Sequence, residues 1–439
     1  MNFSVPVAAP VRGALQLRPF RGLRYVQERA GSVGALAAVT ADGVGDVEPG
    51  DPFHIVRLVL PRGRTSADRT AHAVRTLSHW LSEGVIAADP EPALYVCEQR
   101  GDGFVQCGIV GALRLPRHGD DVVLPHEDVF EHVVEDRAAV LRATAAQLEP
   151  MLLAYQGEEG PDGAGGVIER TVRRPALVSA VMDDGVRHRL WAVTDPAELA
   201  RIDADLSRRQ ALIVDGHHRW ATYLRVRDEV GGHNLPGITS NSPDIEQSWD
   251  FGLALLVDTA RYPFRVRAIH RVLRRLPVAR ALEAVEGAFR VREVRGEVPD
   301  ALEALAEAGS GGGNALLLAG GAARVFHLLD RADPALLART VPRDRPAAWR
   351  ELDATVLHST LLDHVWGVPD EPDEIAYVHD AGAAVEQALR EGGTAVLMRP
   401  VGERTVRELA GAGVRLPRKS TSFGPKPATG LVMRSLTLP

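Results

Sequence analysis

The chain has few cysteines, no excess of one charge sign and no long apolar run. Two cysteines among 439 residues fit a reducing compartment and leave no cysteine cluster for a structural zinc site. Lysine and arginine number 51 against 58 aspartate and glutamate, which gives a net charge of −7. This balance provides no electrostatic footprint for a nucleic-acid backbone or an anionic membrane, so we expect neither as a partner.

Hydrophobic patterning excludes two further classes of protein. No uninterrupted apolar run approaches the length of a membrane span, so the sequence predicts no transmembrane helix. The stretch from Met1 to Pro19 lacks a charged region followed by an apolar one, so we expect no signal peptide. Together with the low cysteine content, these absences predict a cytoplasmic protein.

What is present is typical of a folded protein with more than one unit. Apolar residues make up 45% of the chain and charged residues 25%, which argues against disorder. Helix and strand patterns alternate, which predicts a mixed α/β (α+β) fold. We expect an N-terminal α/β region, a core, a helix-rich subdomain and a C-terminal α/β region, at residues 1–115, 116–275, 276–345 and 346–439.

Hydrophobic periodicity also predicts individual elements. The predicted strands are residues 51–60, 190–193, 211–214 and 251–257, and the predicted helices are residues 67–83, 136–148 and 219–230. Three glycine-rich stretches, residues 157–166, 231–242 and 309–314, predict loops.

Two apolar runs flank Gly101-Asp102-Gly103 and predict a β-hairpin. A three-residue loop at this turn would place Cys97 opposite Cys107. A disulfide between them is geometrically possible, but the reducing compartment favours two buried thiols.

The strongest candidate for a ligand site is a junction between a strand and a helix. The apolar run Leu212–Val214 ends at Asp215, turns on Gly216 and leads into His217, His218 and Arg219. The first amides of a helix have no internal partner and lie at the positive end of its dipole, so they bind anions.

Each residue type at this junction suits a phosphate ligand. Gly216 lets the backbone approach a phosphate closely, and Arg219 offers a planar fork to its oxygens. A histidine at His217 or His218 can donate to the same oxygens. Asp215 can hold a metal ion or accept a proton from a hydroxyl group. The alternative is an Asp-Gly turn, a capped helix and exposed histidines.

A second candidate is the basic, hydroxyl-rich segment Arg415–Lys426, in which Lys419 precedes Ser420 and Thr421. A Walker phosphate loop requires glycine directly before the lysine, and Arg418 stands there, so the segment is not a P-loop. It suits a phosphoryl group or, alternatively, is a solvated tail.

The remaining candidates are weaker. His126-Glu127 and Asp136-Arg137 lack metal-ligand spacing. The pairs His188-Arg189 and His270-Arg271 are expected at the surface, and the basic, aromatic stretch Pro19–Tyr25 is expected to be a structural turn. The glycines near residue 311 follow a helix pattern rather than a strand, so they do not predict a dinucleotide fingerprint.

Taken in order, these segments resemble the DUF1015 family. The resemblance rests on five motifs, which are Pro19–Tyr25, Val56–Pro61, Pro125–Glu127 with Asp136-Arg137, Asp215–Trp220 and Lys419–Leu431. Its most specific parts are the Asp-Gly-His-His-Arg motif and the closing Lys-Ser-Thr segment. The Gly-His-His-Arg turn is also similar to the phosphate-binding turn of the ParB/sulfiredoxin superfamily.

The resemblance implies a ParB/sulfiredoxin-like nucleotide-binding core and a kinase that uses ATP and Mg²⁺ to phosphorylate free L-serine or a related metabolite. It implies that Gly216 and Arg219 hold the phosphates and that Lys419, Ser420 and Thr421 close over the nucleotide. Asp215 would be the base or the Mg²⁺ ligand, with His217 and His218 also catalytic. His126 and Glu127 would contact the hydroxyl substrate. The expected partners are therefore a nucleotide and a small molecule.

The sequence departs from the family pattern in three places. The region Ala37–Val44 lacks the prolines and tyrosine of many members, His54 replaces a common asparagine, and Ala221 replaces a glutamate after Trp220. If that glutamate is needed for turnover, the chain is instead a nucleotide-binding, ParB-like regulatory protein. A sulfiredoxin-type reductase is excluded because His217 stands where that chemistry needs a cysteine.

Overall fold

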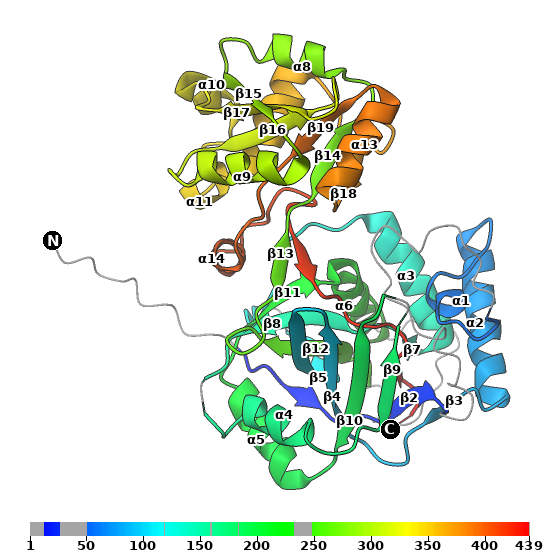
Figure 1. Ribbon diagram of the computed structural model, residues 1–439. Coiled ribbons are helices and arrows are strands. Elements are labelled where there is room, and N and C mark those ends of the chain that lie inside the picture. Colours follow the sequence, from blue (N-terminus) through cyan, green and yellow to red (C-terminus); the bar gives the residue numbers. More distant parts are fainter. Residues whose placement is uncertain are drawn as a thin grey trace. The chain divides into compact units, whose positions relative to one another are not determined.

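The computed structural model describes residues 13–26, 51–117, 119–158, 160–182, 184–231 and 248–438. Contacts divide the chain into two compact units. The first unit comprises Met1–Pro125, Val129–Phe264 and Pro425–Pro439, and the second comprises His126–Asp128 and Arg265–Gly424. Each unit contains both helices and strands, which confirms the mixed α/β class (Figure 1).

Two sequence features lie outside the described residues, namely the divergent region Ala37–Val44 and residues 232–242 of one predicted loop. Among the helices that the structure describes, none has the length and apolar character needed to cross a bilayer.

The first unit is built on a large sheet. Its strands are, in order, β6 (Val123–Leu124), β11 (Ala211–Asp215), β8 (Met151–Tyr155), β12 (Phe251–Asp258), β5 (Phe104–Arg114), β4 (Leu94–Gly101), β10 (Arg187–Val193) and β9 (Val178–Val181), with β1 (Leu17–Arg18) beside β5. The pairs β6–β11 and β8–β12 are parallel, and the other pairs are antiparallel.

Four helices contribute apolar side chains to the main core of this unit. They are α3 (Glu131–Thr144), α4 (Ala164–Thr171), α5 (Pro196–Leu206) and α6 (His217–Gly231). Their residues pack with alternate strand residues such as Val96, Ile109 and Trp191. Because successive strand residues point to opposite faces, this alternation assigns the packed residues to one face of the sheet.

A smaller sheet in the same unit orders β3 (Ile86–Ala88), β2 (Gly22–Tyr25), β21 (Met433–Ser435) and β7 (Ala146–Gln147). Helix α2 (Ser66–Ser82) shares a core with it through Ala73, Leu77 and Trp80. Thr65 and Asp68 form a capping box at the start of α2, so the predicted helix is confirmed and its beginning is explained.

The strand predicted at residues 51–60 is wrong, because this segment contains the one-turn helix α1 (Val56–Val59). The side chain of Asp51 accepts the Phe53 amide at 2.8 Å, and the Tyr25 hydroxyl donates to the Phe53 carbonyl at 2.8 Å. These bonds hold a bend before the helix. Ile55, directly before the helix, and Leu58, within it, are both buried. A short apolar run fits a strand or a buried helical turn equally well, and the tertiary contacts decided the outcome.

The hairpin β4–β5 is confirmed, but the predicted register is wrong by one residue. Gly101 pairs with Phe104, so the turn has two residues, and Cys97 pairs with Gly108 while Cys107 pairs with Glu98. The two cysteines therefore point to opposite faces of the sheet. Both are free and buried, and burial raises the pKa of each thiol to about 12.

Four other expectations need correction. The stretch Pro19–Tyr25, expected to be a structural turn, contains the strand β2, which pairs with β3 and β21. Helix α3 begins five residues before the predicted start and ends before Ala145, which adopts the left-handed conformation. Helix α4 begins inside the glycine-rich stretch at residues 157–166, at Ala164. The histidine–arginine pairs expected at the surface are largely buried, because His188, His270 and Arg271 are 3%, 5% and 0% exposed. They lie on sheet strands, so their polar character did not reveal their position.

The second unit is a six-stranded antiparallel sheet with helices on both faces. The strands are, in order, β15 (Arg290–Arg295), β17 (Val325–Asp330), β16 (Ala315–Ala319), β19 (Thr394–Leu397), β14 (His270–Leu273) and β18 (Ile375–Val378). Leu316 and Leu318 pack on one face with α8 (Val278–Ala284) and the π-helix η2 (Val356–Trp366). Leu317 packs on the other face with α9 (Val298–Gly309) and α13 (Ala381–Glu391).

The remaining elements of this unit are the strands β13 (Arg265–Arg267) and β20 (Ser422–Gly424), which pair with each other, and the helices α10 (Pro334–Thr340), α11 (Ala347–Arg350), α12 (Asp353–Thr355) and α14 (Glu403–Gly411).

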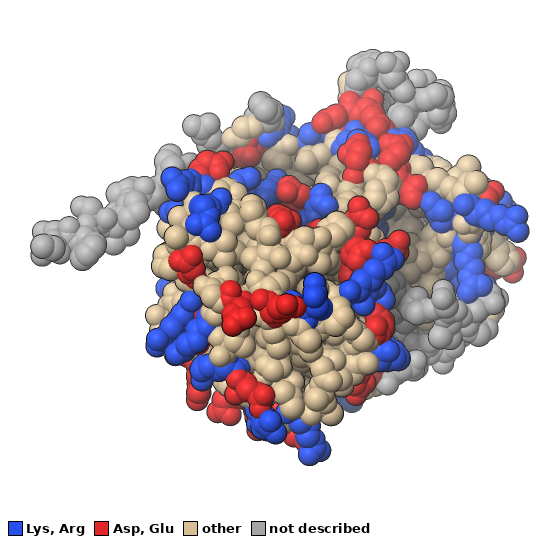
Figure 2. All heavy atoms as spheres, turned by 90° about the horizontal axis from the view of Figure 1, so that it is seen from above, with Lys and Arg blue, Asp and Glu red and all other residues tan. Residues whose placement is uncertain are grey.

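On the face of the molecule drawn in Figure 2, acidic and basic side chains are interspersed among uncharged ones.

Candidate active site

The predicted junction between strand and helix is present in the first unit. Strand β11 ends at Asp215, Gly216 turns with a φ of +97°, and α6 begins at His217. A Cβ atom added at Gly216 would lie 3.0 Å from Nε of Arg219, so the turn brings the backbone against that guanidinium group. The backbone angle therefore favours glycine here, and a side chain at this position would also make Arg219 shift.

Asp215 lies between two cations. Its Oδ1 is 3.0 Å from Nζ of Lys426, and its Oδ2 accepts a hydrogen bond from Nη2 of Arg219. Burial acts to raise the pKa of this carboxyl, but the charges of Arg219 and Lys426 outweigh burial and lower it. Asp215 is consequently ionised at neutral pH and orients both cations.

Arg219 is fixed from two sides. Besides its bond to Asp215, its Nη1 donates to the Pro150 carbonyl at 2.5 Å. Burial acts to lower the pKa of this guanidinium, but the carboxylates of Glu149 and Asp215 raise it overall. These contacts hold the Arg219 side chain in one place. The side chain is 14% exposed and forms part of the wall of a cavity.

The two histidines of the motif differ in their surroundings. His217 is buried, at 7% exposure. His218 accepts the Phe130 amide through Nε2 at 3.0 Å, and its ring stacks on that of Phe130 with centroids 6.0 Å apart. His218 thus links α6 to the residue that precedes α3, while its catalytic role stays a prediction.

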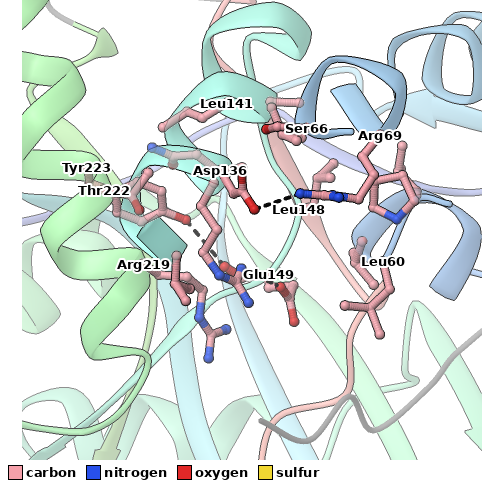
Figure 3. A pocket seen from close by; sticks show the side chains of 18 residues that line it. Leu60, Ser66, Arg69, Asp136, Leu141, Leu148, Glu149, Arg219, Thr222 and Tyr223 are labelled. Atoms are coloured by element: carbon pink, nitrogen blue, oxygen red, sulfur yellow. Dashed lines mark hydrogen bonds and ion pairs between the residues drawn. The ribbon is translucent and has the colours of Figure 1, made fainter. Parts of the chain in front are cut away.

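A cavity of about 340 Å³ adjoins Arg219 (Figure 3). Its walls come from α1 and the residues after it, from α2, α3 and α6, and from β7 and the residues after it. The lining residues are Leu58, Val59, Leu60, Pro61, Ser66, Arg69, Val133, Asp136, Arg137, Val140, Leu141, Ala146, Gln147, Leu148, Glu149, Arg219, Thr222 and Tyr223. Half of them are aliphatic, and apolar walls are common in cavities that hold small molecules.

Charged groups are concentrated in a few places on these walls. Arg69 donates to Asp136 at 2.7 Å, as the dashed line in Figure 3 marks, and Arg137 lies 3.3 Å from Glu149. The Ser66 hydroxyl and then Arg69 lower the pKa of Asp136, so it is ionised. Together with Arg219, the cavity is lined by three guanidinium groups and two carboxylates, a set suited to an anionic ligand with an apolar part.

Segments that are distant in the sequence meet at this place. Leu58–Pro61 and the pair Asp136-Arg137 line the cavity with Arg219. From the closing motif, Lys426 contacts Asp215, and the hydroxyl of Thr429 donates to Glu149 at 3.5 Å. The sequence predicts a phosphoryl group at the segment that contains Lys426, but no local pattern links Lys426, Thr429 or Glu149 to the junction.

The other predicted site residues belong to the second unit. Nε2 of His126 is 3.1 Å from Oγ1 of Thr421, whose hydroxyl donates to Glu127 at 3.4 Å. The Ser420 hydroxyl donates to the Pro417 carbonyl at 2.5 Å, and Lys419 has a φ of +55°. The structure therefore brings the Pro-His-Glu motif together with the Lys-Ser-Thr motif, while the roles of these five residues stay predictions.

The described part of the chain contains no group of three or more histidine, cysteine, aspartate or glutamate side chains arranged to hold a metal ion. Mg²⁺ is commonly bound by one or two carboxylates together with substrate phosphates, so a single carboxylate such as Asp215 would suffice. Its role as a metal ligand stays a prediction.

The model of the DUF1015 family, described as a protein of unknown function, matches residues 17–355. This range contains four of the five motifs, and the fifth, Lys419–Leu431, lies after it. The chain belongs to the DUF1015 family. No curated protein matches the chain. The resemblance predicted from the motifs is thereby confirmed.

Solved structures similar to the chain include enzymes with bound nucleotides. A free serine kinase in complex with AMP is 15% identical, with a TM-score of 0.34, over 72% of this chain and 87% of that one. A mutant of a free serine kinase in complex with ADP is 15% identical, with a TM-score of 0.35, over 73% and 88%. A conserved hypothetical protein from Pyrococcus furiosus is 15% identical, with a TM-score of 0.35, over 75% and 95%.

We expect Gly216→Ala to destabilise the folded protein by about 1–2 kcal/mol, because alanine is strained at a positive φ. The added methyl group also displaces Arg219, so any anion bound at the turn should be held less tightly. Gly231→Ala, at the other end of α6 where a Cβ meets open space, is the matched control and should be neutral or stabilising. Urea unfolding of both variants measures the difference, and equal stability would contradict the strain assigned to Gly216.

Proposed function

We propose that the protein is an ATP-dependent kinase that phosphorylates a small hydroxyl metabolite, L-serine or a close relative. The observation that carries the proposal is the turn at Gly216, which places an ordered Arg219 in the wall of a cavity lined by further arginines. Phosphoryl transfer depends mainly on positioning and on neutralising phosphate charge, and this turn offers both.

The residues present fit the phosphates of a nucleotide. The Cβ-free backbone of Gly216 and the start of α6 offer amides to phosphate oxygens, at the positive end of a helix of 15 residues. Arg219 and Lys426 supply two cations that Asp215 already orients. The apolar walls of the cavity, with Tyr223 on one side, suit the base and ribose.

In the proposed reaction, the acceptor hydroxyl oxygen forms a bond to the γ-phosphorus, and the bond from that phosphorus to the bridging oxygen of ADP breaks. The hydroxyl proton passes to a carboxylate, for which Asp215 remains the predicted group. Arg219 and Lys426 offset the negative charge of the phosphates. ATP bound with Mg²⁺ would supply the transferred group.

The test is direct phosphorylation. The purified protein, incubated with ATP, Mg²⁺ and L-serine, L-homoserine or L-threonine, should form a phosphorylated amino acid and ADP in equal amounts. Phosphorus NMR detects both products. Arg219→Ala should lose the activity, and Arg225→Ala, which removes an arginine from the exposed side of the same helix, should retain it. Formation of no phosphorylated product by the wild-type protein would overturn the proposal.

Ala221 favours a second function, because many family members carry glutamate after the aromatic residue of the motif, which is Trp220 here. If turnover requires that glutamate, the protein binds a nucleotide as a regulatory signal. Binding of ATP without any phosphorylated product would support this second function, and restored turnover in Ala221→Glu would link it to the missing carboxylate.

A further inference from the structure

Three polar side chains form a row across neighbouring strands of the large sheet in the first unit. His188 of β10 pairs with Gln99 of β4, and Gln99 pairs with Gln106 of β5. Residues directly opposite each other in paired strands point to the same face, so the three side chains lie side by side on one face. We call them the polar row.

All three residues of the polar row are buried, with exposures of 3% for His188, 4% for Gln99 and 4% for Gln106. Five of their polar atoms have no hydrogen-bond partner among the described residues. These are both ring nitrogens of His188, both amide atoms of Gln106 and Oε1 of Gln99. The remaining amide nitrogen of Gln99 donates to the Lys426 carbonyl at 2.9 Å.

Unpaired groups at this density call for an explanation, because nearly all buried polar atoms in folded proteins are hydrogen-bonded. A buried donor or acceptor without a hydrogen bond destabilises the folded state, and apolar residues in these positions would avoid that penalty. The three residues are neighbours in the strand register, yet these five atoms do not pair with one another. Such an arrangement is expected where a further molecule completes the hydrogen bonds.

The polar row is connected to the candidate active site through one residue. The backbone carbonyl of Lys426 accepts from Gln99, and the side chain of Lys426 contacts Asp215 at 3.0 Å. Lys426 therefore links the polar row to the carboxylate that contacts Arg219.

The row offers donors and acceptors without net charge. Burial lowers the pKa of His188, so its ring is neutral at pH 7 and provides one donor and one acceptor. The two amides provide further groups of both kinds. This set suits hydroxyl, amino and carboxyl groups of a small molecule whose charges cancel, and it suits a polyanion poorly.

We propose that His188, Gln99 and Gln106 bind the phosphoryl acceptor, a small uncharged or zwitterionic hydroxyl compound. This inference rests on the proposed kinase function and assigns the acceptor to the face of β4, β5 and β10. It also gives a role to Lys426, which positions the row with its backbone and the phosphate site with its side chain.

The test uses the full chain and isothermal titration of L-serine in the presence of Mg²⁺ and a non-hydrolysable ATP analogue. Gln106→Leu should bind L-serine at least tenfold more weakly and the ATP analogue with unchanged affinity. Without ligands its unfolding midpoint should rise, because two unpaired amide atoms are removed. Gln387→Leu, the same substitution at an exposed contact of α13 in the second unit, should change neither affinity.

If the leucine variant does not fold, Gln106→Asn replaces it in the test. This variant keeps the amide but shortens the side chain by one methylene group, and we expect the same tenfold loss of L-serine affinity. Unchanged L-serine affinity in the folded variant would overturn the inference. So would failure of the wild-type protein to bind L-serine, L-homoserine and L-threonine while it binds the ATP analogue. Binding of L-serine that depends on Gln106, without binding of the analogue, would uphold the row and overturn the kinase function.

Discussion

Arg219→Ala should weaken nucleotide binding by about 100-fold or more, equivalent to about 2.7 kcal/mol. Arg219 lines the cavity and also contacts the aspartate of the turn. Its loss removes positive charge from the phosphate site and removes a hydrogen bond that holds Asp215 in place. Arg219→Lys should recover only part of the affinity, because an ammonium group cannot bind two oxygens in one plane. Isothermal titration with ATP measures both variants.

The matched control for this prediction is Arg225→Ala on the same helix. Arg225 forms ion pairs with Glu131 and Glu135 outside the cavity, so its loss removes the same charge without touching the turn. The affinity of the Arg225→Ala variant for ATP should equal that of the wild type within about a factor of two. Equal losses in both variants would show that only the overall charge matters and would contradict a specific role for Arg219.

Asp215→Ala should destabilise the protein by about 2–3 kcal/mol and yet leave nucleotide binding intact or tighter. The substitution leaves Arg219 and Lys426 facing each other without the carboxylate, and uncompensated cations in a partly buried place are destabilising. A bound phosphate would replace the lost negative charge, so ATP should raise the unfolding midpoint of this variant more than that of the wild type. Thermal unfolding with and without ATP tests this.

The same carboxylate should make stability depend on pH in a defined direction. The pKa of Asp215 is lowered in the folded state, so its contribution is fully present above the pKa of aspartate in the unfolded chain. It is lost as the pH falls through the lowered folded value. The stability difference between the wild type and Asp215→Asn should therefore be largest near neutral pH and should shrink in acid, and a constant difference would contradict the ion-pair account.

The junction at Asp215 could be predicted because its signals are local. A buried apolar strand, a glycine and a polar helix start lie within a few residues, and each has a direct structural meaning. The hairpin was predictable for the same reason, although its register depended on a turn length that the sequence leaves open. The segment at residues 51–60 was not predictable, because its helical turn depends on contacts from Tyr25 and on the core it joins.

The partners of the junction could not be derived from spacing, because they come from distant segments. Lys426 lies 211 positions after Asp215. Within its segment, the adjacent hydroxyl groups predicted that Lys419, and not Lys426, contacts the ligand. Glu149 and Arg69 line the cavity without belonging to any recognisable motif. The polar row was hidden for a related reason, since only strand register places His188 beside Gln99.

The central claim is that the turn at Gly216 binds the phosphates of a nucleotide, and thermal unfolding of the wild-type protein tests it most directly. The protein is unfolded alone and with ATP, ADP or CTP, each with and without Mg²⁺. A nucleotide at a hundredfold excess over its dissociation constant should stabilise the folded state by about 2.7 kcal/mol, and we expect this for ATP with Mg²⁺. An unfolding midpoint that none of the three nucleotides raises would contradict the claim.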